Sequence, residues 1–351
     1  MNASASSAAI ANTDLLKVYI TVDVEYAGMA HIGGAKADQI PDASMECLVD
    51  GKPMGLTHVV ESFRRHGLKA TFFVEPMASY RFGEAALART VKTIRDAGQD
   101  VQLHLHPAWL TFKEGKRHSD RLCDYGPAEQ VELIRHGKEL LEKQGAEIVA
   151  FRAGGFAADD RQYQALRELG IPLSSSYCLG YRDQGCEIAG FGERNDVFPA
   201  QGVWEIPAST YRIRDVRKLL GFSRKPLQVG CTTAGNARRV LERAGREGMR
   251  CLTLLLHNWE CLDRAADDWS WKPMRTNTSV AREFEATCAY LADARGRWRV
   301  TTFAEAAREL GPVPAALQAA SGSARTASAS RSAGRNGAPT VPSLNRIYVP
   351  M

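Results

Sequence analysis

The chain has 351 residues, of which 44% are apolar, which is enough for one large α/β domain or two ordinary ones. Its net charge of +5 depends on four arginines after residue 311. Without them, 41 basic residues face 40 acidic ones, a balance that gives no indication of nucleic-acid binding. The eight cysteines include no C-x-x-C pair, so we expect reduced thiols in a cytoplasmic protein, not a disulfide or structural-zinc framework.

Composition also predicts the limits of the folded part. Residues 1–14 are rich in Ala and Ser and lack both basic residues and a long apolar stretch, so we expect a disordered lead-in and no secretory signal. Residues 15–311 are expected to form a single domain. Residues 312–351 contain no acid and few large apolar side chains, which predicts a disordered tail. No apolar run reaches 18 residues, so no transmembrane helix is expected.

Apolar strands and amphipathic helices alternate along the expected domain. The predicted strands lie at 18–25, 69–74, 101–106, 148–151, 171–175, 202–209, 251–256 and 298–300. The predicted helices lie at 55–66, 84–97, 128–143, 159–169, 233–247, 279–294 and 302–310. Residues 107–126 are expected to be a loop. The order of about seven strand–helix units predicts a parallel sheet.

The first predicted strand ends in two carboxylates. Between Val18 and Glu25, apolar residues alternate with polar ones at the period of two that is typical of a strand. Asp23 and Glu25 therefore lie on one face at the carboxyl end, where catalytic groups collect in parallel α/β folds. Taken alone, the pair could equally be a solvated strand end.

The strand at 101–106 ends in two histidines with the same spacing. His104 and His106 lie on one face, close enough together to share an ion. Zinc readily accepts nitrogen and oxygen ligands, and a catalytic zinc site keeps one position open for water. Together with the carboxylates of the first strand, the histidines predict a site for one divalent metal ion, with Zn²⁺ as the favoured ion.

Several short segments follow one another in a specific order. They are Ala70–Val74 with the histidine strand after it, Phe151-Arg152, the strand that ends in His257, and Val300–Phe303. In this order they resemble the NodB-homology polysaccharide deacetylases, carbohydrate esterase family four. The resemblance extends over roughly residues 17–310. It implies a deformed (β/α) barrel of about seven parallel strands and a metal-dependent hydrolysis of N-acetyl groups on sugars.

The resemblance also implies catalytic roles for matched residues. Asp23 corresponds to the catalytic base, and Arg152 corresponds to the arginine that holds this base. His257 matches the histidine of the last motif and would protonate the leaving amine. Backbone N–H groups near Gly155 and Phe156 would help to stabilise the oxyanion.

At other positions the chain departs from the family pattern. Val24 stands where the family usually has a metal-binding aspartate, so Glu25 is expected to be the ligand. Ala108 stands where the second histidine is expected, so His106 is expected to serve beside the first histidine. The usual proline of the third motif is a glycine, and residues 173–177 contain no match for the aspartate of the fourth motif.

These departures leave other functions open. The same fold could hydrolyse a cyclic imide or another amide, or it could be a sugar-binding relic without metal. Cleavage of a glycosidic bond would need two acids about 5–10 Å apart and would leave the histidines without a role. The absence of G-x-S-x-G, P-loop and G-x-G-x-x-G motifs disfavours a serine esterase, an NTPase and a dinucleotide-binding enzyme.

The expected substrate is a glycan or an amino-sugar-containing precursor. Aromatic side chains near the motifs could contact sugar rings, and the candidates are Trp109, Phe156 and Trp259. The sequence does not specify the glycan, its carrier or the oligomeric state.

Overall fold

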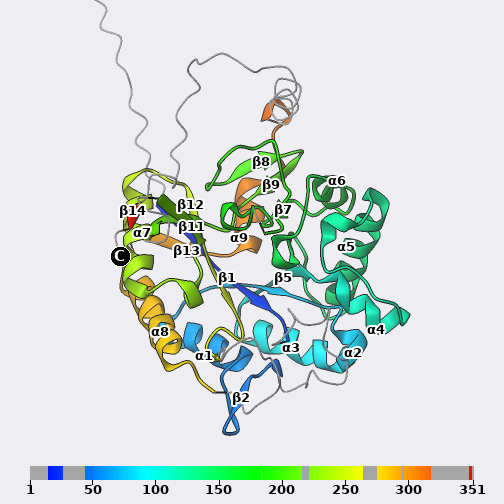
Figure 1. The fold of residues 1–351 in the computed structure, drawn as a ribbon, viewed down its shortest axis with the longest axis horizontal. Helices are drawn as coiled ribbons and strands as arrows, with labels where there is room; N and C mark the ends of the chain where they lie inside the picture. The colour runs from blue at the N-terminus through cyan, green and yellow to red at the C-terminus, as the bar shows by residue number, and fades with distance from the viewer. Residues whose placement is uncertain are drawn as a thin grey trace, which may run out of the picture.

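The computed structural model describes residues 15–26, 44–182, 184–215, 221–263, 275–294, 296–317 and 348–349. Its main sheet has nine strands, in the order β12-β1-β4-β5-β6-β7-β9-β8, with β13 paired to β1 (Figure 1). These strands are β1 (Leu16–Val24), β4 (Thr71–Val74), β5 (Asp100–Leu105), β6 (Ala150–Ala153), β7 (Leu173–Ser174), β8 (Phe198–Ala200), β9 (Val203–Glu205), β12 (Cys251–His257) and β13 (Trp298–Thr301). All pair in parallel except β8, which is antiparallel to β9. The expected curled, parallel α/β sheet is confirmed.

Strand β1 lies next to the end strand β12 of this sheet and has three neighbours. Residues 17–23 pair with β12 along one edge. On the other edge, residues 16–19 pair with β13 and residues 21–24 pair with β4. The sheet therefore divides along this edge, and it curls into a half-barrel that is consistent with a deformed (β/α) barrel.

Helices cover the outer face of the sheet (Figure 1). They are α1 (Leu56–His66), α2 (Ser79–Phe82), α3 (Glu84–Asp96), α4 (Leu110–Glu114), α5 (Pro127–Glu142), α6 (Arg161–Glu168), α7 (Ala234–Arg246) and α8 (Thr278–Asp293). The even-numbered residues of β1, from Val18 to Val24, are buried in the core between sheet and helices, together with Phe63 of α1. Burying a side chain of this kind stabilises the fold by roughly 1.5–3 kcal/mol.

The odd-numbered residues of β1 face the inside of the half-barrel. Tyr19 packs there against Phe303, the first residue of α9 (Phe303–Leu310), with ring centroids 5.1 Å apart, and Phe73 of β4 lies at the same distance from Phe303. The N–H of Phe303 donates to Thr71 Oγ1 at 2.9 Å. Helix α9 thus closes the amino-terminal end of the half-barrel with apolar side chains, and the polar odd-numbered residues of β1 lie toward the opposite end.

The predicted helices and all eight predicted strands are present, with ends shifted by a few residues. The expectation that 107–126 is a loop is wrong, because this segment contains η4 (Pro107–Trp109), α4 and η5 (Leu122–Asp124). These helices are too short to show a hydrophobic period. Two hairpins were also missed, and their strands are β2 (Leu48–Val49), β3 (Lys52–Pro53), β10 (Thr210–Asp215) and β11 (Gly221–Pro226).

Parts of the expected tail are described. Val313 is buried in the inner core with Trp204, so the packed part of the chain extends slightly beyond residue 311. Farther on, β14 (Tyr348–Val349) pairs in parallel with β10. The other tail residues and the expected lead-in, 1–14, lie outside the described residues. No helix in the described part of the chain is both long and apolar enough to cross a membrane.

Candidate metal centre and active site

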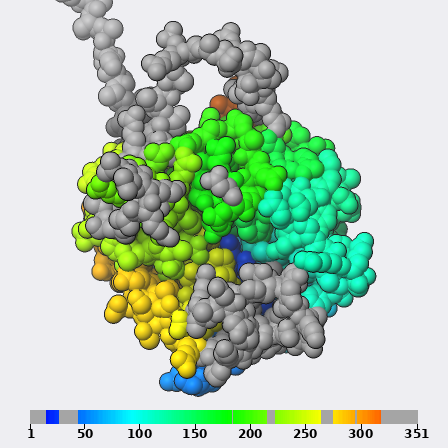
Figure 2. Space-filling model, viewed as in Figure 1, coloured from blue at the N-terminus to red at the C-terminus, as the bar shows by residue number. Residues whose placement is uncertain are grey.

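Parallel pairing brings the polar strand ends to one edge of the sheet. In the register of the strands, Asp23 lies beside His257, and His104 lies beside Arg152. Because the side chains of these residues point inward, they meet above the core that α9 closes. Figure 2 shows dark blue atoms from the region of β1 at the centre of one face, between the green and cyan parts of the molecule.

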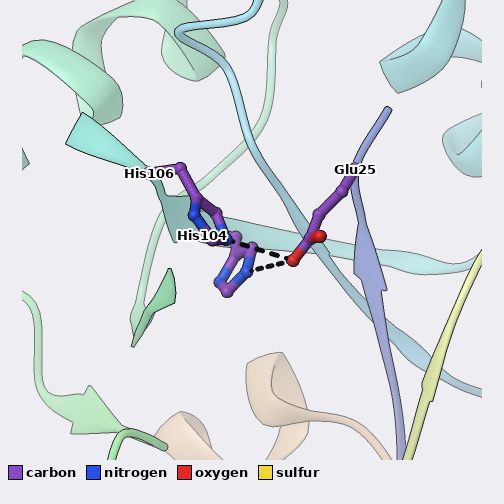
Figure 3. Close-up of side chains that lie close together, drawn as sticks. All are labelled: Glu25, His104 and His106. Carbon is purple, nitrogen blue, oxygen red and sulfur yellow. Dashed lines mark hydrogen bonds and ion pairs between the residues drawn. The ribbon is translucent and has the colours of Figure 1, made fainter. Parts of the chain in front are cut away.

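Glu25, His104 and His106 form the first cluster at this edge (Figure 3). Glu25 Oε1 lies 2.9 Å from His104 Nε2 and 3.2 Å from His106 Nε2. All three side chains are buried. The two strands that carry them are separated by β4, so the curl of the sheet brings the carboxylate and the two imidazoles together.

The other ring nitrogen of each histidine faces an acceptor. His104 Nδ1 lies 2.9 Å from the carbonyl oxygen of Arg152, and His106 Nδ1 lies 2.8 Å from Asp120 Oδ2. Since these oxygens only accept, each Nδ1 carries a proton, and a neutral ring then presents the lone pair of Nε2 to Glu25. Three electron-pair donors converge, and they repel one another unless a positive charge lies between them. A divalent cation fits this donor set. The set consists of two nitrogens and a carboxylate oxygen, which are suitable ligands for zinc.

The electrostatics of the cluster also favour opposite charges. Burial by itself would raise the pKa of Glu25, but the histidines 106, 104 and 257 hold that pKa well below its usual range. Burial would likewise lower the pKa of His106. The carboxylates of Asp120 and Glu25 outweigh this effect and hold the pKa of His106 well above its usual range. Without a metal ion, a second proton on His106 supplies the positive charge that the cluster requires.

Gly154 provides the space for the His106 ring. A Cβ atom at this position would lie 2.5 Å from His106 Cε1 and 2.6 Å from both ring nitrogens. Gly154 is the residue that stands in place of the usual proline. Ala108, which stands in place of the usual second histidine, is buried, and its N–H donates to Asp120 Oδ1 at 3.3 Å. The two departures from the family pattern therefore meet at one imidazole.

Asp23 and Arg152 form a fully buried ion pair beside this cluster. Arg152 Nη1 donates to Asp23 Oδ1 at 2.6 Å and to Thr21 Oγ1 at 3.1 Å. The guanidinium also donates to the carbonyl and hydroxyl oxygens of Ser175, and its carbon lies 4.2 Å from the centroid of the Phe73 ring. Ser175 belongs to the segment in which the aspartate of the fourth motif is missing. The arginine is thus held in one orientation and engages one oxygen of the Asp23 carboxylate.

His257 lies on the opposite side of the two carboxylates of β1. Ligand atoms of Asp23, Glu25 and His257 all lie within 4.8 Å of one another, so Glu25 is shared between two clusters. His257 Nδ1 lies 2.9 Å from Glu260 Oε2, and the ring of Trp259 stacks on the imidazole with centroids 4.3 Å apart. Burial would lower the pKa of His257, but the hydrogen bond to Glu260 and the charges of Glu25, Glu260 and Asp23 raise that pKa.

The three residues proposed as sugar contacts differ in their surroundings. Trp109 is 0% exposed and packs against Tyr26 and Phe82, so its expected role as a stacking surface is not available in this structure. Phe156 is 4% exposed and adopts a left-handed backbone with φ of 56°, which is uncommon for a residue with a side chain. Trp259 is 9% exposed and lies against His257.

Sequence reasoning missed three carboxylates at the site. Asp120 comes from the segment that was expected to be a loop, and Glu260 lies in the turn after β12. Glu75 follows β4 directly, accepts hydrogen bonds from the N–H groups of Met77 and Ala78, and has a pKa raised to about 8 by burial. No motif spacing in the sequence identifies Asp120 or Glu260. The position of Glu75 at a strand end was the one available signal.

Comparison with solved structures identifies the fold. A protein from Mycobacterium smegmatis that is classed as a polysaccharide deacetylase superposes with a TM-score of 0.53 at 17% identity, over 84% of this chain and 90% of that chain. A 4-alpha-glucanotransferase from Thermococcus litoralis has a TM-score of 0.49 at 9% identity over 85% and 41% of the two chains. A family 4 carbohydrate esterase from Streptomyces lividans has a TM-score of 0.39 at 11% identity over 83% and 93%.

At these identities the likeness concerns the fold alone, and the chain has the fold of the polysaccharide deacetylases. No protein-family model and no curated protein sequence matches the chain.

Proposed function

We propose that the chain is a metal-dependent hydrolase that removes N-acetyl groups from an amino-sugar-containing glycan or glycan precursor. The observation that carries the proposal is the convergence of Glu25 with the Nε2 atoms of His104 and His106, directly beside a buried Asp23–Arg152 pair. This arrangement combines a cation-binding donor set with a second carboxylate that is not needed to complete it. A sugar-binding relic would have no reason to retain both.

Glu25, His104 and His106 would hold the metal ion, and Zn²⁺ suits two imidazoles and a carboxylate. When bound, such an ion supplies Lewis-acid chemistry, which polarises an amide carbonyl and eases the ionisation of water. The acceptors on the two Nδ1 atoms keep both Nε2 atoms directed into the site.

Asp23 would act as the general base. Arg152 engages Oδ1 of the carboxylate at 2.6 Å, and this contact fixes the group while Oδ2 can accept a proton from the attacking water. The guanidinium makes four further contacts, with Thr21, Ser175 and Phe73, and these hold it in place when a substrate binds. Arg152 thus serves to orient the base.

His257 would act as the general acid and protonate the amine that leaves. Its position on the far side of Asp23 and Glu25 allows base and acid to act on opposite sides of the amide. Gly155 and Phe156 follow Arg152 and have successive left-handed backbones, with φ of 55° and 56°. We propose that their N–H groups assist in stabilising the oxyanion, since strained backbone of this kind is concentrated at active sites.

Phe156 and Trp259 remain the proposed aromatic contacts of the substrate. Hydrolysis of another amide, such as a cyclic imide, is the second candidate function, because the second and fourth motifs depart from the family pattern. A cytoplasmic location is proposed from the reduced cysteines alone.

The test uses the full-length protein loaded with one equivalent of Zn²⁺. It measures the acetate and free amine released from N-acetylated sugars, and the half-amide acid formed when a cyclic imide ring is opened. Two substrate classes are compared, N-acetylated amino-sugar oligosaccharides and small cyclic imides. Acetate release that is lost on chelation and restored by Zn²⁺ supports the proposal. Turnover of the imides alone would move the function to the second candidate, and full activity after complete metal removal would overturn the metal-dependent mechanism.

A further inference from the structure

Glu260 is a buried carboxylate that has no role in the mechanism proposed above. It lies in the turn after β12 and is 4% exposed. Its Oε2 lies 2.9 Å from His257 Nδ1 and accepts from the backbone N–H of the same residue at 3.2 Å. Gln228 Nε2 donates to both carboxylate oxygens, at 3.2 and 3.1 Å. These donors hold the carboxylate in one orientation next to the imidazole.

The fold leaves space for this carboxylate at a particular glycine. Gly230 belongs to η9 (Val229–Cys231), and a Cβ atom at this position would overlap Glu260 Oε1. Its φ is not in the left-handed region, so the backbone conformation does not require a glycine here. The absence of a side chain at residue 230 is therefore explained by the position of Glu260.

The contact with Glu260 decides which nitrogen of His257 carries the proton. An ionised carboxylate accepts only, so the 2.9 Å contact with Glu260 Oε2 favours a proton on Nδ1 over the longer, 3.4 Å approach of Gln228 Nε2 to the same nitrogen. Nε2 is then the nitrogen left for Asp23 and Glu25, which lie within 4.8 Å of a ligand atom of His257. A free imidazole in water can exchange its proton between the two nitrogens. The stacked Trp259 ring prevents the imidazole from turning over to present the other nitrogen.

We infer that Glu260 is a positioning residue for His257, which fixes the tautomer and ring orientation that direct Nε2 to the reacting amide. As far as it concerns catalysis, this inference rests on the proposed function, in which His257 protonates the leaving amine. The tautomer itself does not depend on any activity. Glu260 acts through the histidine and does not contact the substrate.

The first experiment reads the tautomer directly. Histidine-selective ¹⁵N NMR is recorded on the full-length protein, and the His257 signals are identified by their loss in His257→Ala. We expect a protonated Nδ1 and an unprotonated Nε2 in the neutral ring, and a shift toward protonated Nε2 in Glu260→Ala. A neutral His257 ring that is protonated on Nε2 and not on Nδ1 in the wild-type protein would overturn the inference, whether or not the protein is a deacetylase.

The second experiment separates positioning from folding. Glu260→Gln keeps an acceptor oxygen for Nδ1, whereas Glu260→Ala removes it, so we expect kcat to fall by about 10²-fold or more in the alanine variant and by about tenfold in the glutamine variant. KM, metal content and melting temperature should stay near wild type in Glu260→Gln. Asp263→Asn, at an exposed position of the same turn, is the control and should be unchanged. Equal kcat values for Glu260→Ala and wild type would overturn the inference. If no variant turns over any amide, the proposed function fails and the NMR result alone decides the tautomer.

Discussion

The two halves of the site are built in different ways. Glu25, His104 and His106 are here called the metal half. The pairing of the strands places them, with the two histidines two residues apart, and a single acceptor then orients each histidine. Asp23, Arg152 and His257, the acid–base half, depend on side-chain partners from separate segments of the chain, Ser175 and Glu260 among them. A ligand of the metal half can therefore be supplied from a different position in the sequence, whereas the acid–base half keeps its geometry only if several segments of the chain keep theirs.

Such a change in the position of a ligand is seen at His106. The family pattern places the second histidine at the position of Ala108, which lies in η4, and here the imidazole comes from two residues earlier, directly after β5. Gly154 admits the ring, and Asp120 holds its Nδ1. Two changes that look like separate losses in the sequence, at residues 108 and 154, thus belong to one rearranged ligand, and this rearrangement is what the following variants test.

The largest effect is expected when both histidines of the metal half are removed. His104→Ala combined with His106→Ala leaves one carboxylate ligand, and metal content should fall from about one ion per chain to near zero, with loss of activity. Elemental analysis of the purified variant measures this. Full metal occupancy in the double variant would show that the ion binds elsewhere, in the cluster of Asp23, Glu25 and His257.

The next comparison replaces one carboxylate in each half with the corresponding amide. Asp23→Asn should keep the metal and lose kcat by about 10²–10⁴-fold, because an amide cannot act as the general base. Glu25→Gln should lose metal and activity together, because Glu25 Oε1 is the group on which both histidines converge. The reverse pattern of metal content would mean that Asp23 is the ligand and Glu25 its outer partner.

A smaller effect is expected at Gly154. The added methyl of Gly154→Ala must displace the His106 ring, so we expect metal affinity to fall by about 10–100-fold, as for other losses of ligand orientation, while the fold is kept. Competition with a zinc chelator measures the affinity. Gly235→Ala is the matched control, because a Cβ atom there meets nothing within 4 Å. Unchanged affinity in Gly154→Ala would show that His106 is not a ligand.

The smallest effect is a pH dependence in the metal-free protein. The lowered pKa of Glu25 contributes stability above the usual glutamate range, and this contribution is lost as the pH falls through the lowered value. The raised pKa of His106 contributes stability that is fully present below about pH 6.5 and is lost as the pH rises through the raised value. Metal-free protein should therefore have its highest melting temperature between about pH 4.5 and 6.5, whereas Zn²⁺ should bind more tightly as the pH rises because it displaces protons. Melting curves with and without chelator measure both, and a metal-free optimum above pH 8 would contradict the assignment.

The difference between the two halves also explains which parts of the site could be predicted from the sequence. The alternation of Val18 to Glu25 and the spacing of His104 and His106 depend only on the two-residue period of a strand, and both pairs lie on the predicted inner face. Asp120 and Glu260 reach the site through the folding of turns, and no regular spacing in the sequence relates them to His106 and His257. For Trp109, a place near a motif suggests an aromatic contact with substrate, but packing decides whether a ring faces a ligand or the core, and this ring packs against Tyr26 and Phe82.

The position of β1 also has a consequence for how the chain folds. Strand β1 is made first, yet its pairing with β12 and β13 must wait for the far end of the chain, and the contact between Glu25 N and Asn258 Oδ1 spans 233 residues. Helix α9, which closes the amino-terminal end of the half-barrel, is among the last elements to be synthesised. Long-range pairing of this kind slows folding and leaves strand edges exposed meanwhile. A nascent chain that stops before residue 298 would therefore carry an open β1 edge and uncovered Tyr19 and Phe73 rings, which makes it a substrate for chaperones until the final strand and helix arrive.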